Sequence, residues 1–293
     1  MFKKTFRVLL VIVLVAAAIF LFEKYQAHKL KQEQHQNSEK NKTEEISITL
    51  IEGWSNKEIG DYLQKQGIVT SVDFLQTIKS YDTTEYDSFL PKEAKGKLQG
   101  FLYPDTYRLF KSTADRSITP AAVASEQILT KLLNNFKIKL PKDAENLAKK
   151  QGLSLYEAIT LASIVENETG RNAFTAEQKA KLDEERKIIA GIFYNRLNSG
   201  VALQSDATIN YITNKKDPAV SQADLEISSP YNTYRNKGLP PTPISNPSLS
   251  SILAVLEPAK TDYFYFLHKQ PSGEAVYSKT FEEHVVNKQK YLR

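Results

Sequence analysis

The chain has 293 residues, no cysteine, a formal net charge of +5 and 41% hydrophobic residues. This length suffices for one large or two modest domains with appendages, and the apolar content is enough for a buried core. The missing cysteines exclude disulfides, thiolate catalysis and zinc–thiolate sites. A small positive charge over this length is compatible with an anionic polymer or a membrane surface, and it is not diagnostic of nucleic-acid binding.

The first residues predict a membrane anchor. Three basic residues among the first seven stand before or within the start of an apolar run that extends from about residue 6 to residue 22. Such a run is at the short end for a membrane-spanning helix, which needs about 17–25 residues. The alanines at 16–18 resemble a signal-peptide cleavage site, but the run continues past them, which favours an uncleaved anchor. The charge bias predicts a cytoplasmic tail at residues 1–5 and an exported body.

A polar linker and a small module are predicted next. Residues 23–45 are rich in Lys, Gln and Glu and almost free of large aliphatic side chains, as expected of a solvated stalk or tether. Residues 46–95 begin with an alternating strand and continue with two helices. Ser55 and Glu58 form a capping-box pattern at the start of the first helix. We therefore expect a small α+β module of strand–helix–helix order.

The remaining residues, 96–293, are predicted to form a larger mixed α/β domain. The predicted helices lie at about 120–135, 141–150, 154–169, 175–198, 248–256 and 281–292, and a β-hairpin is predicted over 262–279. The segment from 200 to 247 is rich in turn residues. Loops of that length in a compact domain are usually functional.

Two glutamates, Glu166 and Glu168, lie in the last turn of the predicted helix at 154–169. Side chains two positions apart point about 200° apart around a helix axis, so these two cannot face each other at one site. The helix C-terminus and burial both act to raise the pKa of a carboxyl group. A carboxyl that keeps its proton at neutral pH suits general acid catalysis. Taken alone, the same pattern also fits a capped or solvated helix end.

Several segments are dense in Tyr, Asn, Gln and Asp. They are "GFLYPDTYRL", "LQSDATINY", "SPYNTYRNKGLPPTPISNP" and "AVLEPAKTDYFYF". Aromatic faces pack on sugar rings, and short polar side chains form hydrogen bonds with hydroxyl and acetamido groups. This composition favours a groove for an N-acetylated glycan, although tight turns use the same residue types.

Taken together and in this order, these segments resemble the YceG-like (MltG-type) endolytic murein transglycosylases. "LASIVENET" is similar to the family signature "ASI-[IV]-E-x-E-T", and "LQSD", "YNTY" with "GLPP", and "PAKTDYFYF" are similar to its later blocks. The resemblance extends from about Ile46 to the C-terminus. The short N-terminal anchor with an exported body is also the layout of this family.

The resemblance implies a lytic transglycosylase that cuts nascent peptidoglycan glycan strands internally. It places Glu168 at the position of the catalytic glutamate, which acts first as acid and then as base on the bond between N-acetylmuramic acid and N-acetylglucosamine. The product has a 1,6-anhydro end, and one carboxylate suffices, whereas ordinary glycoside hydrolases use two. The residues implied to lie along the glycan groove are Gln204, Asp206, Asn232 and Tyr234, with Glu166 as a neighbour of the catalytic residue.

The resemblance also implies the fold and the partners. The implied fold class is α+β, with an N-terminal transmembrane helix at 6–22, a LysM-like module at 46–95 and a lysozyme-like transglycosylase domain at 96–293. No metal ion and no organic cofactor is expected. The expected partners are peptidoglycan glycan strands, the cell membrane and peptidoglycan synthases of the elongation or division machinery, and no nucleic acid. The N-terminus is expected in the cytoplasm and the catalytic domain outside it.

The chain departs from the family pattern at four positions. Gln99 stands where a glutamate commonly precedes "GF-x-PDT", Ala207 where proline is frequent, and Thr242 and Ser248 where glycines are common. Two other functions stay open. A muramidase would hydrolyse the same bond with Asp206 as its second carboxylate, and a scaffold protein of the cell-wall machinery would bind glycan without cutting it.

Overall fold

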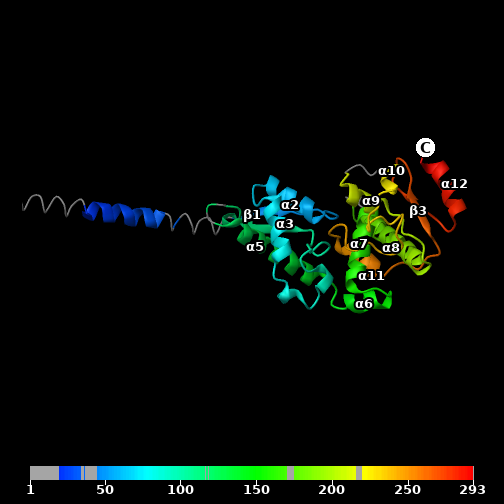
Figure 1. Cartoon of the computed structure of the whole chain (residues 1–293), viewed down its shortest axis with the longest axis horizontal. Coiled ribbons are helices and arrows are strands. Elements are labelled where there is room, and N and C mark those ends of the chain that lie inside the picture. The colour runs from blue at the N-terminus through cyan, green and yellow to red at the C-terminus, as the bar shows by residue number, and fades with distance from the viewer. Residues whose placement is uncertain are drawn as a thin grey trace, which may run out of the picture.

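The computed structural model describes residues 20–33, 36, 45–115, 117, 119–169, 175–215 and 220–292. The predicted anchor at 6–22 lies outside these ranges except for its last three residues, which belong to an exposed helical segment at 20–33 (Figure 1). None of the helices in these ranges is both long enough and apolar enough to cross a membrane. The anchor therefore stays a prediction.

The N-terminal lobe, residues 45–140, contains a two-stranded antiparallel sheet and a small group of helices. Strand β1 (Glu45–Thr49) pairs with β2 (Thr106–Phe110), and Ile48 and Tyr107 are partners in the ladder. Helices α2 (Asn56–Lys65) and α3 (Ser71–Ser80) pack against each other, and α5 (Ala121–Lys139) packs on α3. The short helix α4 (Lys111–Ala114) follows β2 directly.

The strand–helix–helix order predicted for residues 46–95 is present in this lobe. The capping box of Ser55 and Glu58 forms as predicted at the start of α2. However, β1 finds its partner strand at 106–110 and α3 packs on a helix at 121–139, so the lobe continues well past the predicted boundary at residue 95. Strand β2 was missed because its alternation of exposed and buried residues lasts only five positions.

The C-terminal lobe, residues 144–292, is organised around three helices (Figure 1). Helix α7 (Leu155–Thr169) is buried along nearly its whole length. Helices α8 (Ala176–Asn198) and α11 (Leu249–Leu256) pack against it and against each other, and α6 (Ala144–Lys150) lies at their side. Burial of α7 on several sides fixes the position of its last turn, which carries both glutamates.

A β-hairpin and a terminal helix complete this lobe. Strands β3 (Tyr265–His268) and β4 (Ala275–Ser278) are antiparallel, as the sequence predicts, and α12 (Phe281–Tyr291) packs on them. The ring of Phe266 in β3 packs edge-on against Phe193 of α8, with centroids 5.9 Å apart. The hairpin therefore lies along α8.

The segment at 200–247 contains two helices that the sequence analysis did not predict, α9 (Asp206–Thr213) and α10 (Gln222–Leu225). The other predicted helices are confirmed, with ends that differ by a few residues. The fold is mixed α and β, with two separate two-stranded sheets among the described residues. The LysM-like and lysozyme-like assignments stay predictions.

Candidate active-site cleft

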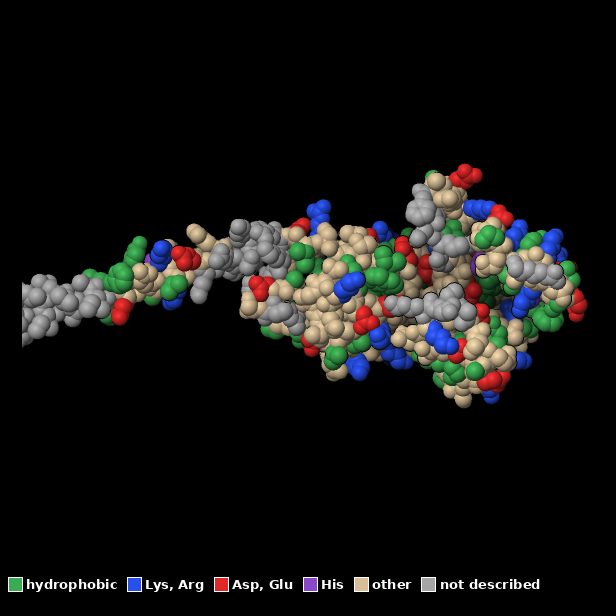
Figure 2. All heavy atoms as spheres, turned by 90° about the horizontal axis from the view of Figure 1, so that it is seen from above, with side chains coloured by type: hydrophobic (Ala, Val, Ile, Leu, Met, Phe, Trp, Pro, Cys, Tyr) green, Lys and Arg blue, Asp and Glu red, His purple; other side chains and the backbone are tan. Residues whose placement is uncertain are grey.

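A cleft of about 1230 Å³ lies between the two lobes. One wall is formed by α2 and the residues just before it, including Trp54 and Tyr62. The other wall is formed by the end of α7 and the start of α9, including Glu168 and Asp206. His268, from the end of β3, also borders the cleft. Acidic side chains lie where the two lobes meet (Figure 2). The cleft thus brings together residues that are far apart in the sequence.

Asn246 connects the two lobes beside this cleft. Its backbone N–H donates to the carbonyl of Trp54 at 2.8 Å, and its own carbonyl accepts from the N–H of Gly53 at 2.9 Å. Its side-chain oxygen accepts from the N–H groups of Gly100 and Leu102 at 2.9 and 3.0 Å. Since Asn246 is almost fully buried, these bonds are shielded from water and hold the loop at 240–247 against the N-terminal lobe.

Glu168 lies in the last turn of α7, and its side chain borders the cleft and is partly exposed. The Ser205 hydroxyl donates to its Oε1 at 2.5 Å, and the backbone N–H of Ala207 is a further donor. Burial, with a smaller contribution from the charge of Asp206, raises the pKa of the Glu168 carboxyl above its usual value. The bonds from Ser205 and Ala207 and the charge of His268 act in the opposite direction without cancelling that rise.

Helix α9 begins directly in front of Glu168. Ser205 occupies the N-cap position of α9, yet its side chain does not cap that helix, because the hydroxyl is donated to Glu168 instead. The carboxyl group therefore lies beside backbone N–H groups at the positive end of a helix dipole, which favour its ionised form. The site combines burial, which favours the protonated form, with preplaced donors, which favour the carboxylate.

Asp206 and Tyr234, both predicted to lie along the groove, are bonded to each other. The Tyr234 hydroxyl donates to Oδ1 of Asp206 at 2.5 Å. Asp206 is exposed and borders the cleft, while Tyr234 is partly buried behind it. Burial, together with this bond to Asp206, raises the pKa of Tyr234, so Tyr234 is a hydrogen-bond donor that orients Asp206.

Gln204 stands next to these residues in a left-handed backbone conformation, with a φ of 54°. Its side-chain oxygen accepts from a guanidinium nitrogen of Arg196 at 2.5 Å, and its backbone N–H donates to the carbonyl of Thr233. Such a conformation is uncommon for a residue with a side chain. The side chain is exposed and bonded to Arg196, and Gln204 is not among the residues that border the cleft; it belongs to the loop that presents Ser205.

Asn232 differs from its predicted place along the groove. It is fully buried, and its side-chain N–H groups donate to the carbonyls of Leu225 and Ile227 at 2.9 Å. Its side-chain oxygen accepts from the backbone N–H of Tyr234 at 3.0 Å. Because these bonds occupy its amide, Asn232 braces the loop from inside and does not face the cleft.

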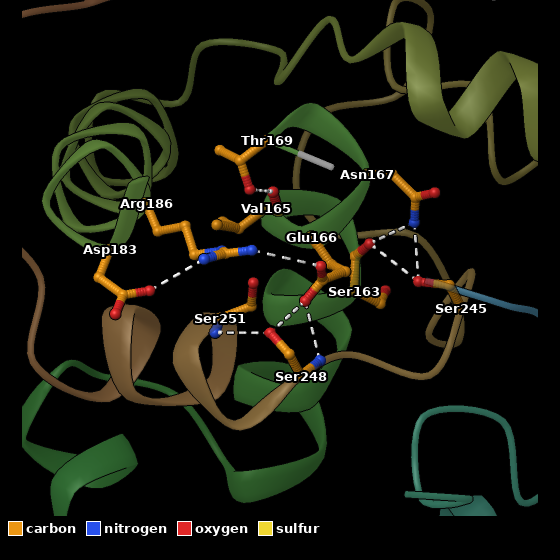
Figure 3. A network of polar contacts seen from close by, with 10 residues as sticks. All are labelled: Ser163, Val165, Glu166, Asn167, Thr169, Asp183, Arg186, Ser245, Ser248 and Ser251. Atoms are coloured by element: carbon orange, nitrogen blue, oxygen red, sulfur yellow. Dashed lines mark hydrogen bonds and ion pairs between the residues drawn. The ribbon is translucent and has the colours of Figure 1, made fainter. Parts of the chain in front are cut away.

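Glu166 points away from the cleft, as the 200° separation from Glu168 requires. Its Oε2 accepts from the backbone N–H and the hydroxyl of Ser248, at 2.8 and 2.5 Å, and its Oε1 lies 3.6 Å from the guanidinium of Arg186 (Figure 3). Arg186 also donates to Asp183 at 2.9 Å. Glu166 therefore joins α7 to the start of α11 and to α8, and it is not placed to bind a substrate in the cleft.

Other residues that border the cleft were not identified from the sequence as site residues. Trp54 and Tyr62 pack ring to ring, with centroids 5.2 Å apart. Gln99, noted only as a departure from the family pattern, is buried at the cleft, and its side-chain oxygen accepts from the N–H of Asn56 at 2.8 Å. His268 had no recognisable motif around it.

Among the described residues, no group of three or more His, Asp or Glu side chains is arranged to hold a metal ion. The polar groups around Glu168 are those of an acid–base site. A partly exposed carboxyl with a raised pKa, and donors ready to stabilise its anion, can give a proton to a substrate oxygen and later take one back.

Comparison with known proteins identifies the family. The model of the YceG-like family matches residues 23–290. The chain belongs to this family. It is 38% identical over 258 residues to the endolytic murein transglycosylase of Bacillus subtilis (strain 168), a match that covers 84% of this chain and 65% of that protein. It is 31% identical over 259 residues to the endolytic murein transglycosylase of Streptococcus pneumoniae serotype 2, covering 81% and 43%.

A solved structure of the YceG-like family has the same fold. The 2.6 Å crystal structure of a YceG-like protein from Listeria monocytogenes superposes on this chain with a TM-score of 0.66 at 32% identity, covering 82% of this chain and 75% of that one. The chain thus spans about two thirds of the Bacillus relative and less than half of the pneumococcal one. Family membership rests on this agreement of sequence and fold.

Proposed function

We propose that this YceG-like protein is an endolytic murein transglycosylase that cleaves the bond between N-acetylmuramic acid and N-acetylglucosamine within peptidoglycan glycan strands. The observation that carries the proposal is Glu168, a partly exposed carboxyl with a raised pKa in a cleft large enough for several sugar rings. The names of the Bacillus and pneumococcal relatives support the substrate class.

The first chemical step uses Glu168 as the acid. Its carboxyl proton moves to the glycosidic oxygen, and the bond from C1 of the muramyl residue to that oxygen breaks, with the electron pair leaving on the oxygen. Burial raises the pKa of Glu168 and so favours the protonated form that this step uses. The carboxylate that remains is stabilised by the Ser205 hydroxyl and the N–H of Ala207.

The second step uses the same group as the base. The Glu168 carboxylate takes the proton of the muramyl C6 hydroxyl while that oxygen attacks C1, which yields the 1,6-anhydro end and restores the acid. No water is consumed. One glutamate that can hold and release a proton is sufficient for this cycle, which agrees with Glu166 being occupied elsewhere.

The rest of the cleft fits a polymer of sugars. Trp54 and Tyr62 offer aromatic surface on one wall, and Tyr211 and Tyr231 form a second ring pair with centroids 5.0 Å apart. Aromatic faces favour the apolar faces of sugar rings. Asp206, oriented by Tyr234, is an acceptor for a substrate hydroxyl or amide.

The proposal extends to the cellular setting. The apolar run at 6–22 and the basic residues before it support a single membrane-spanning anchor with the N-terminus in the cytoplasm and the catalytic lobes outside. The partners in this arrangement are the membrane, the glycan strands and the peptidoglycan synthases that produce them. Cross-linking in membranes followed by identification of the linked proteins tests the synthase partnership.

The activity is tested with the full-length chain in detergent and uncrosslinked glycan strands, with products read by mass spectrometry. We expect anhydro-ended fragments from the wild type and a loss of at least about 100-fold in Glu168→Gln, since a general acid contributes about 10²–10⁴ in rate. Glu184→Gln, an exposed position on α8, is the matched control and should retain full activity.

Asp206 gives the same experiment a second informative outcome. Because Asp206 borders the same cleft as Glu168, a hydrolytic reaction with two carboxylates is the rival chemistry. Products heavier by one water, with reducing ends, would establish a muramidase. Strand binding without cleavage by folded wild type would contradict both enzymatic readings and establish a glycan-binding scaffold.

A further inference from the structure

His268 borders the cleft that contains Glu168, although it comes from a different part of the chain. It is the last residue of β3, and its side chain is 25% exposed. The ring of Phe266 packs against it at a steep angle, with centroids 5.9 Å apart, and Phe266 in turn packs on Phe193 of α8. The imidazole is therefore fixed on its protein side and open on its cleft side.

Glu185 of α8 stands behind His268. Its Oε1 lies 3.0 Å from Nε2 of the imidazole, and the glutamate side chain is only 9% exposed. A carboxylate accepts and does not donate, so Nε2 carries the proton of this hydrogen bond. A buried carboxylate needs a donor or a cation beside it. Glu185 is therefore placed to pair with the imidazolium form of His268.

The nitrogen Nδ1 of His268 has no hydrogen-bond partner in the part of the chain that the structure describes, nor is it among the buried unpaired atoms found there. It is thus left on the open side of the ring. The His268 imidazole thus lies between the Glu185 carboxylate and the cleft. Nothing in the two steps assigned to Glu168 uses this pair.

The protonated form of His268 acts on the pKa of Glu168. Of the charged groups that influence Glu168, His268 favours the carboxylate, whereas Asp206 of α9 favours the protonated form. Tyr234 is bonded to Asp206, and the charge of Glu168 contributes to the raised pKa of Tyr234. Glu185 faces His268 from α8 and balances its charge.

We propose that His268, held by Glu185, is a positioning residue of this cleft that stabilises the carboxylate of Glu168 after the glutamate has given up its proton. The inference rests on the proposed acid–base function of Glu168. In the first step the proton goes from Glu168 to the glycosidic oxygen, which leaves a negative charge on Glu168. The imidazolium of His268 attracts this carboxylate electrostatically and transfers no proton. The step therefore balances without any further reactant.

This placement resolves a conflict in the requirements of a single-carboxyl mechanism. Burial favours the protonated acid, but it also penalises the anion that forms in the transition state. A cation fixed nearby by its own buried counter-ion lowers that penalty without moving during the reaction, which is the usual advantage of preorganised charges. Ser205 and Ala207 contribute by hydrogen bonds, and His268 contributes by charge.

A direct titration of Glu168 tests the proposal independently of catalysis. The full-length chain in detergent is labelled with ¹³C at the glutamate side-chain carboxyl carbons, and the Glu168 signal is assigned as the one missing from Glu168→Gln. We expect the midpoint of Glu168 to rise in His268→Gln, because the positive charge is removed, and to fall back in His268→Lys, which restores a charge. His28→Gln, an exposed histidine far from the cleft, should leave the midpoint unchanged.

Equal midpoints in wild type and His268→Gln would overturn the proposal, and so would equal rises in His268→Gln and His268→Lys, which would indicate a merely structural effect. The titration gives this answer even if wild type cleaves no glycan, an outcome that would count against the proposed function alone.

In active protein, His268→Gln should lower the maximal kcat about tenfold, leave KM within about twofold, and move the alkaline limb of the kcat profile to higher pH. A fall in kcat with no movement of that limb would contradict the proposal.

Discussion

Glu166 and Glu168 are two positions apart in one helix, and their surroundings give them different tasks. Glu168 opens to the cleft and keeps a raised pKa because burial outweighs the hydrogen bonds that it accepts. Glu166 is buried between α8 and α11, where Ser248 and Arg186 occupy both of its oxygens. The helix geometry that separates them could be derived from the sequence, whereas the partners of each could not.

Ser205→Ala should raise the pKa of Glu168 further. The Ser205 hydroxyl is the largest of the interactions that lower this pKa, so its removal leaves burial and Asp206 less opposed. A raised pKa means that Glu168 keeps its proton to higher pH. We therefore expect the alkaline limb of the kcat profile on glycan strands to move to higher pH, while kcat itself falls because the carboxylate loses a donor. A limb that stays in place would contradict the assignment of Glu168 as the acid.

Glu166→Gln should destabilise the fold. The substitution leaves Ser248 with a weaker acceptor and removes the charge opposite the buried Arg186, whose side chain is 9% exposed. Removing one partner of a buried, hydrogen-bonded pair costs about 2–3 kcal/mol of unfolding free energy. A urea titration followed by circular dichroism measures this loss, with Glu184→Gln as the control that changes the free energy by less than about 0.5 kcal/mol. The pH profile of kcat should not move, and a shifted limb would show that Glu166 acts on the chemistry.

At the scale of the elements, a helix or strand could be predicted from the sequence when it was long enough to show a clear pattern. Helices α7 and α8 are long and begin at clear capping boxes, Ser154 with Glu157 and Thr175 with Gln178, so their positions followed from the sequence. Strand β2 and helix α9 are short, and α9 starts at a serine whose side chain does not cap it. Helix α9 has only eight residues, which is too few turns for a clear periodic pattern.

The same reasoning explains which site residues could be found. Glu168 and Asp206 lie in recognisable motifs that also reach the cleft. Asn232 lies in an equally recognisable motif, yet its side chain is buried and bonded to the loop backbone. A motif does not show whether a residue faces the solvent or stabilises a loop from inside. His268 and Glu185 are brought together only by the packing of the hairpin on α8. Contacts of that kind depend on the tertiary structure and leave no local pattern.

At the scale of the whole molecule, hydrogen bonds from Asn246 fix the loop at 240–247 of the C-terminal lobe against the N-terminal lobe. These bonds help to keep the two walls of the cleft in place. The N-terminal lobe contributes one wall of the cleft, and the C-terminal lobe contributes Glu168, the proposed acid. We therefore expect a glycan strand bound at Glu168 to lie beside α2 as well. Buried apolar residues of both lobes form one core cluster, so the two lobes together define the binding surface.

Trp54 allows this arrangement to be measured, because it is the one tryptophan in the chain and it borders the cleft on the wall opposite Glu168. A sugar ring placed over Trp54 would remove water from the partly exposed indole. We expect uncrosslinked glycan strands to shift the tryptophan emission to shorter wavelength in a saturable manner. The full-length Glu168→Gln variant is used because cleavage is expected to be slow in it. Dextran, a neutral glucose polymer without acetamido or lactyl groups, should leave the emission unchanged. If strands bind by sedimentation while the emission stays constant, the strand does not pass along α2, and the cleft would then be occupied only on the side of α7 and α9.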